Sequence, residues 1–213
     1  MRQKYCAIFI GIFSLLLIVS SVSAEIISPE EAIGFPVGAD YKLARWETIT
    51  DYLRSLAASS DRVILEERGK TTEGLDFVLV LISSPENLAN LDRYKVIQRK
   101  LANPQEHSLT ELERLAQKGK AVVMISCNIH STEVASSQMS MELAYQLATE
   151  STPKVAEILD NTILLLIPSA NPDGLNMVVD WYEHTVNTPY EGCLLYTSPS
   201  PRDRTRSRMP SSA

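Results

Sequence analysis

Three short apolar runs constrain the fold of this chain more than any other feature. They are DFVLVLIS (76–83), AVVMIS (121–126) and TILLLI (162–167), and each is typical of a buried strand. VILEERG (63–69) predicts a further short strand. Apolar residues at helical spacing and one capping-box pattern predict helices at 41–59, 86–102, 109–118 and roughly 132–149. Strands alternating with helices predict an α/β domain with a mixed, largely parallel sheet and helices on both faces.

The N-terminus predicts export from the cytoplasm. Residues 1–24 contain two positive charges, an apolar core at 7–19 and the small residues VSA at 22–24, where a signal peptidase cleaves. The core is shorter than the roughly 20 apolar residues that span a bilayer. We therefore expect a signal peptide, a mature chain from about Glu25 and a periplasmic or extracellular protein without stable membrane association. An uncleaved anchor is the alternative.

The last 21 residues do not continue the pattern of the domain. Residues 193–213 are polar and rich in Arg and Pro, and they have no apolar periodicity. Back-translated, 193–203 and 207–213 resemble two parts of a sequencing adapter in the correct order. We expect a non-native, disordered tail and exclude it from fold reasoning; a natural disordered basic tail is the alternative. The predicted domain is 25–192.

Charge argues against two classes of partner. Subtracting the two positive charges of 1–24 and the net three of 193–213 from the total of −6 leaves −11 for residues 25–192. Such a domain does not attract nucleic acid or anionic membranes through its overall field. Cys127 is the only cysteine in this range, so no intrachain disulfide is expected. Nothing in the composition indicates an oligomeric state.

The stretch CNIHSTEV places His130 and Glu133 where the run 121–126 ends and a helix begins. Positions i and i+3 share one helical face, so the imidazole and the carboxylate can converge on one ion. Both groups are zinc ligands, although catalytic zinc normally takes three protein ligands. A surface pair that arises by chance at a helix start is the alternative.

A second polar motif follows the strand at 162–167. NPDG (171–174) leaves the same edge of the sheet as His130 if the two strands are parallel, and ligands gather at that edge in α/β proteins. The motif has turn chemistry and can simply shape its loop. Alternatively, Asn171 or Asp173 holds a metal ligand in the correct orientation.

Three blocks resemble the zinc carboxypeptidases of the funnelin type. They are the strand with NIHSTE (121–133), the helix VASSQMSMELAYQLA (134–148) and IPSANPDG (167–174), within a likeness over about 35–192. The resemblance implies a Zn²⁺ enzyme that hydrolyses C-terminal residues from peptide substrates, with His130 and Glu133 as the first two zinc ligands. It also implies a third ligand, a histidine, about a hundred residues later. A general-base glutamate and an arginine for the substrate carboxylate are likewise expected beyond Gly192.

No other residue of the chain matches those missing positions. His107 lies in a polar loop before the pair, and His184 does not match the position of the third ligand. Cys127 is more typical of a small buried residue than of a ligand. We therefore interpret the chain as the N-terminal part of such an enzyme, truncated at its C-terminal side and inactive by itself.

Two other functions remain open at this point. A zinc-dependent deacylase or amidase on the same scaffold would cleave an acyl amino acid or a cell-wall peptide. A non-catalytic binding module could share the fold without the chemistry. The segment that carries the arginine and the general base would distinguish all three functions.

Overall fold

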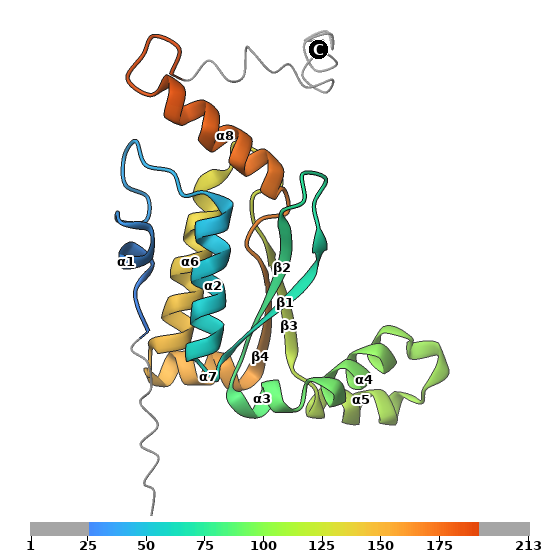
Figure 1. Cartoon of the computed structure of the whole chain (residues 1–213). Helices are drawn as coiled ribbons and strands as arrows, with labels where there is room; N and C mark the ends of the chain where they lie inside the picture. Colours follow the sequence, from blue (N-terminus) through green and yellow to red (C-terminus); the bar gives the residue numbers. More distant parts are fainter. Residues whose placement is uncertain (1–25, 192–213) are drawn as a thin grey trace, which may run out of the picture.

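The computed structural model describes residues 26–191, and a single four-stranded sheet organises them (Figure 1). Its strands are β1 (Val63–Lys70), β2 (Asp76–Ile82), β3 (Ala121–Ser126) and β4 (Thr162–Ile167). They lie in the order β1-β2-β4-β3. The four predicted strands are therefore confirmed, as is the mixed α/β class. The predicted signal peptide and tail lie outside the described residues.

The prediction of a largely parallel sheet is wrong for these strands. β1 pairs with β2 and β2 pairs with β4 in antiparallel fashion, and only β3 and β4 are parallel. A short connection, residues 71–75, joins β1 to β2, and such a link permits only an antiparallel pair. The crossover from β3 to β4 runs through two helices, which suits a parallel pair.

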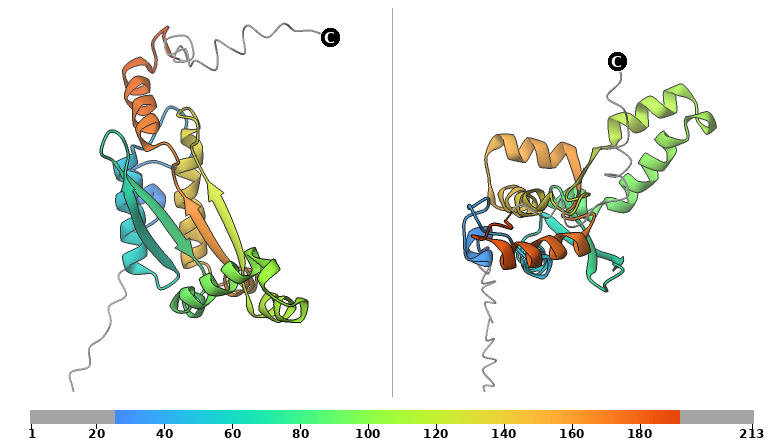
Figure 2. Two further views of the ribbon diagram at one scale, coloured as in Figure 1. Left: turned by 90° about the vertical axis from the view of Figure 1, so that its right-hand side faces the viewer. Right: turned by 90° about the horizontal axis from the view of Figure 1, so that it is seen from above.

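The helices cover the two faces of the sheet unequally. Within 26–191 they are α1 (Pro29–Ile33), α2 (Trp46–Ser59), α3 (Pro85–Ala89), α4 (Leu91–Ala102), α5 (Leu109–Lys118), α6 (Val134–Thr149), α7 (Pro153–Asn161) and α8 (Pro172–Thr185), with a 3₁₀ turn at Pro104–Glu106. α2 and α6 lie side by side on one face and bury the main core (Figure 1). α4 and α5 reach only one end of the other face, where a small second cluster forms (Figure 2).

β3 is more exposed than its sequence predicts. Val122, Val123 and Met124 are 42%, 44% and 63% exposed, whereas β4 beside it is mostly buried. β3 is an edge strand, and the helices α4 and α5 do not extend over its outward face (Figure 2). The apolar run AVVMIS was thus assigned correctly as a strand and wrongly as a buried one, because the run itself does not reveal which neighbours cover it.

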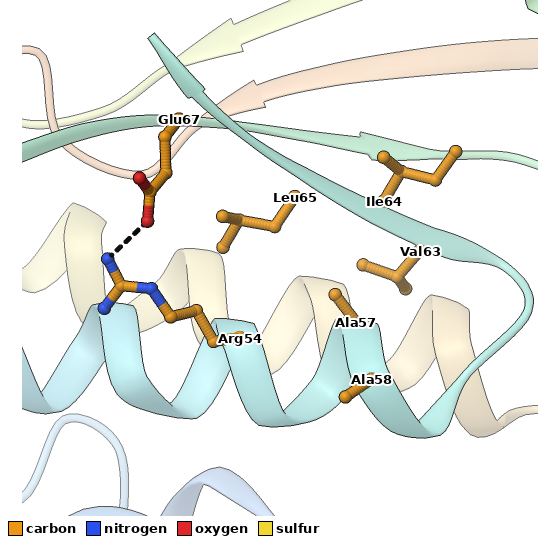
Figure 3. A pocket seen from close by; sticks show the side chains of 7 residues that line it. All are labelled: Arg54, Ala57, Ala58, Val63, Ile64, Leu65 and Glu67. Atoms are coloured by element: carbon orange, nitrogen blue, oxygen red, sulfur yellow. Dashed lines mark hydrogen bonds and ion pairs between the residues drawn. The ribbon is translucent and has the colours of Figure 1, made fainter. Parts of the chain in front are cut away.

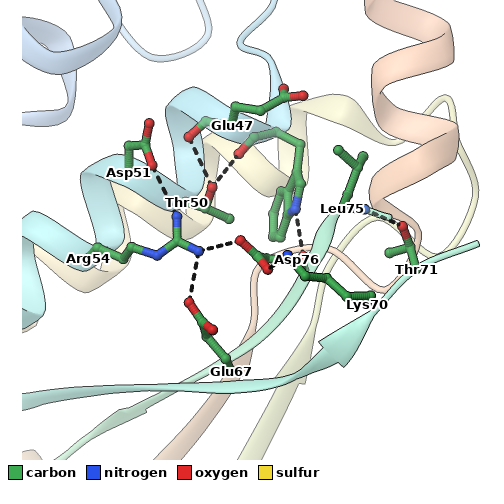
Figure 4. Close-up of polar contacts among 10 residues, drawn as sticks. Glu47, Thr50, Asp51, Arg54, Glu67, Lys70, Thr71, Leu75 and Asp76 are labelled. Atoms are coloured by element: carbon green, nitrogen blue, oxygen red, sulfur yellow. Dashed lines mark hydrogen bonds and ion pairs between the residues drawn. The ribbon is translucent and has the colours of Figure 1, made fainter. Parts of the chain in front are cut away.

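An ionic network fixes the β1–β2 hairpin to α2 (Figure 4). The Arg54 guanidinium contacts Asp51 at 3.0 Å, Glu67 at 3.1 Å and Asp76 at 2.5 Å. Lys70 also pairs with the Asp76 carboxylate. The indole of Trp46 donates a hydrogen bond to the backbone oxygen of Asp76 at 2.8 Å. The hairpin that carries residues 71–75 is therefore held by charge as well as by the core.

Candidate metal centre

The ends of β3 and β4 bring two polar loops together. The strands run in parallel with Ser126 opposite Ile167. Beyond them, the Cys127 amide donates to the Ile167 oxygen at 2.9 Å, and the Ala170 amide donates to the Cys127 oxygen at 2.8 Å. The segments that lead to His130 and to the NPDG motif therefore leave the same edge of the sheet, as predicted.

His130 and Glu133 contact each other at the start of α6. The imidazole Nδ1 of His130 lies 2.9 Å from Oε1 of Glu133, and the backbone N–H of His130 donates to Oε2 at 3.1 Å. The Glu133 amide in turn donates to the His130 oxygen at 2.9 Å. The two side chains are 69% and 47% exposed. The predicted convergence of the pair is present, on an accessible surface.

The electrostatics of the pair favour the charge state that binds a cation. The pKa of the Glu133 carboxyl lies below its ordinary value, first because of the hydrogen bond from the His130 side chain and then because of the bond from the His130 backbone N–H. The carboxylate is therefore ionised at neutral pH. Metal ions bind carboxylates in their deprotonated form, so Glu133 can bind a metal ion at neutral pH without first losing a proton.

The donor atoms of the pair fit zinc. An imidazole nitrogen and a carboxylate oxygen both bind zinc at about 2.0–2.2 Å, and two such ligands at a tetrahedral ion lie ~3.4 Å apart. The observed separation of 2.9 Å is that of a hydrogen bond, which an ion between the two atoms would replace. The pair therefore fits as two members of a zinc ligand set.

The described residues do not complete that set. Within 26–191, no three or more His, Cys, Asp or Glu side chains gather so that they could hold a metal ion. The imidazole Nδ1 of His107 lies 3.5 Å from a carboxylate oxygen of Glu111. The imidazole Nδ1 of His184 forms a hydrogen bond with the backbone oxygen of Asp180 within α8. Cys127 is buried, and this burial raises the pKa of its thiol, which disfavours the thiolate that a metal would need. None of these three joins the pair.

The NPDG motif builds the first turn of α8. The Asn171 side chain accepts a hydrogen bond from the Gly174 amide at 3.0 Å, and Pro172 occupies the first turn, where its missing N–H is not needed. A Cβ on Gly174 would lie only 2.4 Å from the Asn171 side chain. Asp173 accepts hydrogen bonds from the Thr71 hydroxyl at 2.5 Å and the Glu73 amide at 3.2 Å. The hydrogen bonds of the Asn171 and Asp173 side chains thus stabilise the loop and the hairpin, and none of these bonds is made to His130.

Sequence reasoning missed Asn128, which lies two residues before His130. It is 1% exposed and has a backbone φ of 51°. A signal was available, because Asn is one of the few residues enriched in the left-handed region, and here only Cys127 separates it from the end of a strand.

Two hollows on the described surface lie away from the pair. One lies between α2 and β1, and the Arg54–Glu67 ion pair borders it (Figure 3). It is lined by Arg54, Ala57, Ala58, Val63, Ile64, Leu65 and Glu67. The other is an apolar hollow between β3, β4 and the helices α6 and α7. Neither is lined by residues of the two polar loops.

Comparison with known proteins identifies one family. The family model described as zinc carboxypeptidase matches residues 49–193, which is more than half of the chain. A comparison with curated proteins gave no significant match.

Several solved carboxypeptidases are similar to parts of the chain. Carboxypeptidase A from Helicoverpa armigera is 21% identical with a TM-score of 0.43 over 75% of this chain and 32% of its own. The metallo-carboxypeptidase from Burkholderia cenocepacia is 19% identical with a TM-score of 0.41, over 61% of this chain and 27% of its own. The chain thus spans about a third or less of the length of these proteins.

Proposed function

This chain belongs to the zinc carboxypeptidase family, and we propose that His130 and Glu133 bind zinc in an enzyme that removes C-terminal residues from peptides. The observation that carries the proposal is the contact between the two side chains at 2.9 Å, at the edge where β3 and β4 end together. An imidazole and an ionised carboxylate on one accessible helix start form two thirds of a catalytic zinc ligand set.

Each of the two residues has a defined part in the proposed site. The strand-to-helix corner presents both side chains in one direction, and the backbone N–H of His130 orients the Glu133 carboxylate through Oε2. When bound, zinc would polarise the scissile carbonyl and lower the pKa of a bound water. We propose that the third ligand, the general base and the arginine for the substrate carboxylate belong to sequence that follows Gly192 in the protein, as the family resemblance implies.

We also propose that the protein acts outside the cytoplasm on peptides. The proposal of export depends on residues 1–24, which lie outside the described structure. Within 26–191, no helix is long and apolar enough to cross a membrane. The net charge of −11 for residues 25–192, obtained from the total of −6 as above, makes nucleic acid an unsuitable partner.

The test is substrate selectivity of the protein expressed from its source gene, with zinc present and after removal by a chelator. Three substrates are compared: a peptide with a free C-terminus, the same peptide with a C-terminal amide, and an N-acyl amino acid. The proposal predicts zinc-dependent release of the terminal residue from the free peptide and little from the amide. Preference for the acyl amino acid would indicate a deacylase, and no turnover of any substrate despite bound zinc would indicate a binding module. Either result would contradict the proposal.

A further inference from the structure

Asn128 occupies the junction between β3 and the metal-binding pair. It follows the strand after Cys127 and precedes His130 by two residues. Its side chain is polar, yet only 1% of the residue is exposed. A buried amide at this position calls for an explanation, because buried polar groups are destabilising unless they form hydrogen bonds.

The Asn128 side chain binds the loop that follows β4. Its Nδ2 donates to the Ser169 hydroxyl at 2.9 Å and to the Asn171 backbone oxygen at 3.1 Å. These acceptors are 41 and 43 residues away in the sequence. One amide nitrogen thus holds the exit of β3 against the exit of β4.

The backbone of Asn128 is tied to the start of α6. Its N–H donates to the Ser136 hydroxyl at 2.9 Å, and that hydroxyl donates to the backbone oxygen of Glu133 at 2.6 Å. The φ of 51° turns the chain sharply at this residue, in a region that Asn tolerates better than most residues. The position of the segment 129–133 is therefore determined on both sides of His130.

The oxygen of the Asn128 side-chain amide differs from the nitrogen in its contacts. Oδ1 is buried and has no hydrogen-bond partner among the described residues. Leaving a buried acceptor unpaired is unfavourable, so the side-chain hydrogen bonds that offset the burial of this amide are the two from Nδ2.

We propose that Asn128 is a positioning residue for metal binding: by holding the loop after β4, its buried amide fixes the backbone that presents His130. The proposal rests on the proposed function, since it assumes that His130 binds zinc. Groups that only orient metal ligands typically change metal affinity by about 10- to 100-fold when they are removed. Asn128 itself would not touch the metal and would act only through the chain next to His130.

The test is the zinc dissociation constant of the protein from the source gene, measured by competition with a chromophoric chelator. Asn128→Gly is the main variant, because glycine adopts the positive φ freely and only the amide is lost. Ser169→Ala removes one of the two acceptors, and the double variant shows whether the two residues act together. Asn187→Gly is the matched control, because Asn187 has a φ of 62° on an exposed loop.

The expected result is a zinc affinity about 10- to 100-fold weaker for Asn128→Gly at a temperature where the protein is folded. Ser169→Ala should weaken binding less, and the double variant should add little to Asn128→Gly. A residue with a purely structural role would lower the melting temperature and leave the zinc affinity of the folded protein unchanged. Unchanged affinity in a folded Asn128→Gly variant would overturn the proposal. So would a variant that does not fold, since the amide would then serve the whole domain and not the site.

The same measurement separates this inference from the proposed function. If the wild-type protein binds no zinc, or binds it equally well after His130→Ala, the proposed function fails. If zinc binding depends on His130 and is indifferent to Asn128, only the positioning role fails.

Discussion

The carboxylate of Asp173 accepts a hydrogen bond from the hydroxyl of Thr71 at 2.5 Å, although the two residues are 102 positions apart in the sequence. The same hydroxyl accepts a bond from the Leu75 amide at 3.0 Å within the hairpin loop (Figure 4). The start of α8 therefore holds the tip of the β1–β2 hairpin. This contact gives the aspartate of the NPDG motif a structural role in the described part of the chain.

Asp173→Ala should loosen that hairpin. It removes the acceptor for both Thr71 and the Glu73 amide, and a lost hydrogen bond of this kind costs about 1 kcal/mol. For a domain of this size we expect the melting temperature to fall by about 2–4 °C. Asp92→Ala is the control, because the Asp92 side chain is almost fully exposed. Equal melting temperatures for the two variants would contradict the role given to Asp173.

Asp76→Asn should weaken the attachment of the hairpin to α2 in a pH-dependent way. The pKa of Asp76 lies below its ordinary value, first because Lys70 and then because Arg54 donates hydrogen bonds to its carboxylate. A lowered pKa stabilises the fold above the unfolded value of about 3.9, and this stabilisation is lost as pH falls through the folded pKa. Because the ion pairs are partly exposed, we expect the variant to lose about 1 kcal/mol at pH 7.

Melting temperatures of wild type and Asp76→Asn at pH 7, 5 and 3 provide the check. The difference between them should be similar at pH 7 and 5 and should shrink at pH 3, where the wild-type carboxylate begins to protonate. A difference that grows on acidification would show that the sign of the effect is wrong.

The exposed apolar residues of β3 should promote self-association of the mature 25–213 chain. An uncharged edge strand offers free backbone groups and apolar side chains to a second copy. Met124→Lys should shift size-exclusion profiles towards the monomer, since a lysine on an edge strand opposes pairing. Val96→Lys on α4 changes an equally apolar exposed residue elsewhere and should have no such effect. A monomeric wild-type chain would refute this prediction.

The genome of the source organism should not encode residues 193–213 after the codon for Gly192. The prediction rests on the resemblance of these residues to adapter sequence and on their lack of apolar pattern. Sequencing across that codon is the measurement, and an uninterrupted CLLYTSPSPRD in the genomic reading frame would rule it out.

The elements differ in how far the neighbouring sequence determines them. The three apolar runs and the segment VILEERG located all four strands, and the corner at His130 and Glu133 followed from the end of one run and the start of a helical pattern. The sequence analysis did not predict α8, because Asn and Pro favour both a turn and a helix start. In the structure the motif starts a helix, and Asp173 in its first turn contacts the hairpin, which the local sequence does not show.

Other features depend on residues far apart in the sequence. The antiparallel pairing of β2 with β4 and the exposure of β3 depend on which elements lie beside each strand, and the apolar runs do not show this. Asn128 is similar: its partners Ser169 and Asn171 are more than forty residues away, so its role is not readable from the local stretch NIHSTE.

Zinc content of the protein expressed from the source gene is the direct test of His130 and Glu133 as metal ligands. The variants are His130→Ala and Glu133→Ala, with His107→Ala and His184→Ala as controls that remove the other two histidines of residues 26–191. We expect about one zinc ion per wild-type protein and per control, and little zinc in the two variants, because the remaining ligands do not replace a lost one. Stoichiometric zinc in His130→Ala, at wild-type affinity, would contradict the assignment of the site.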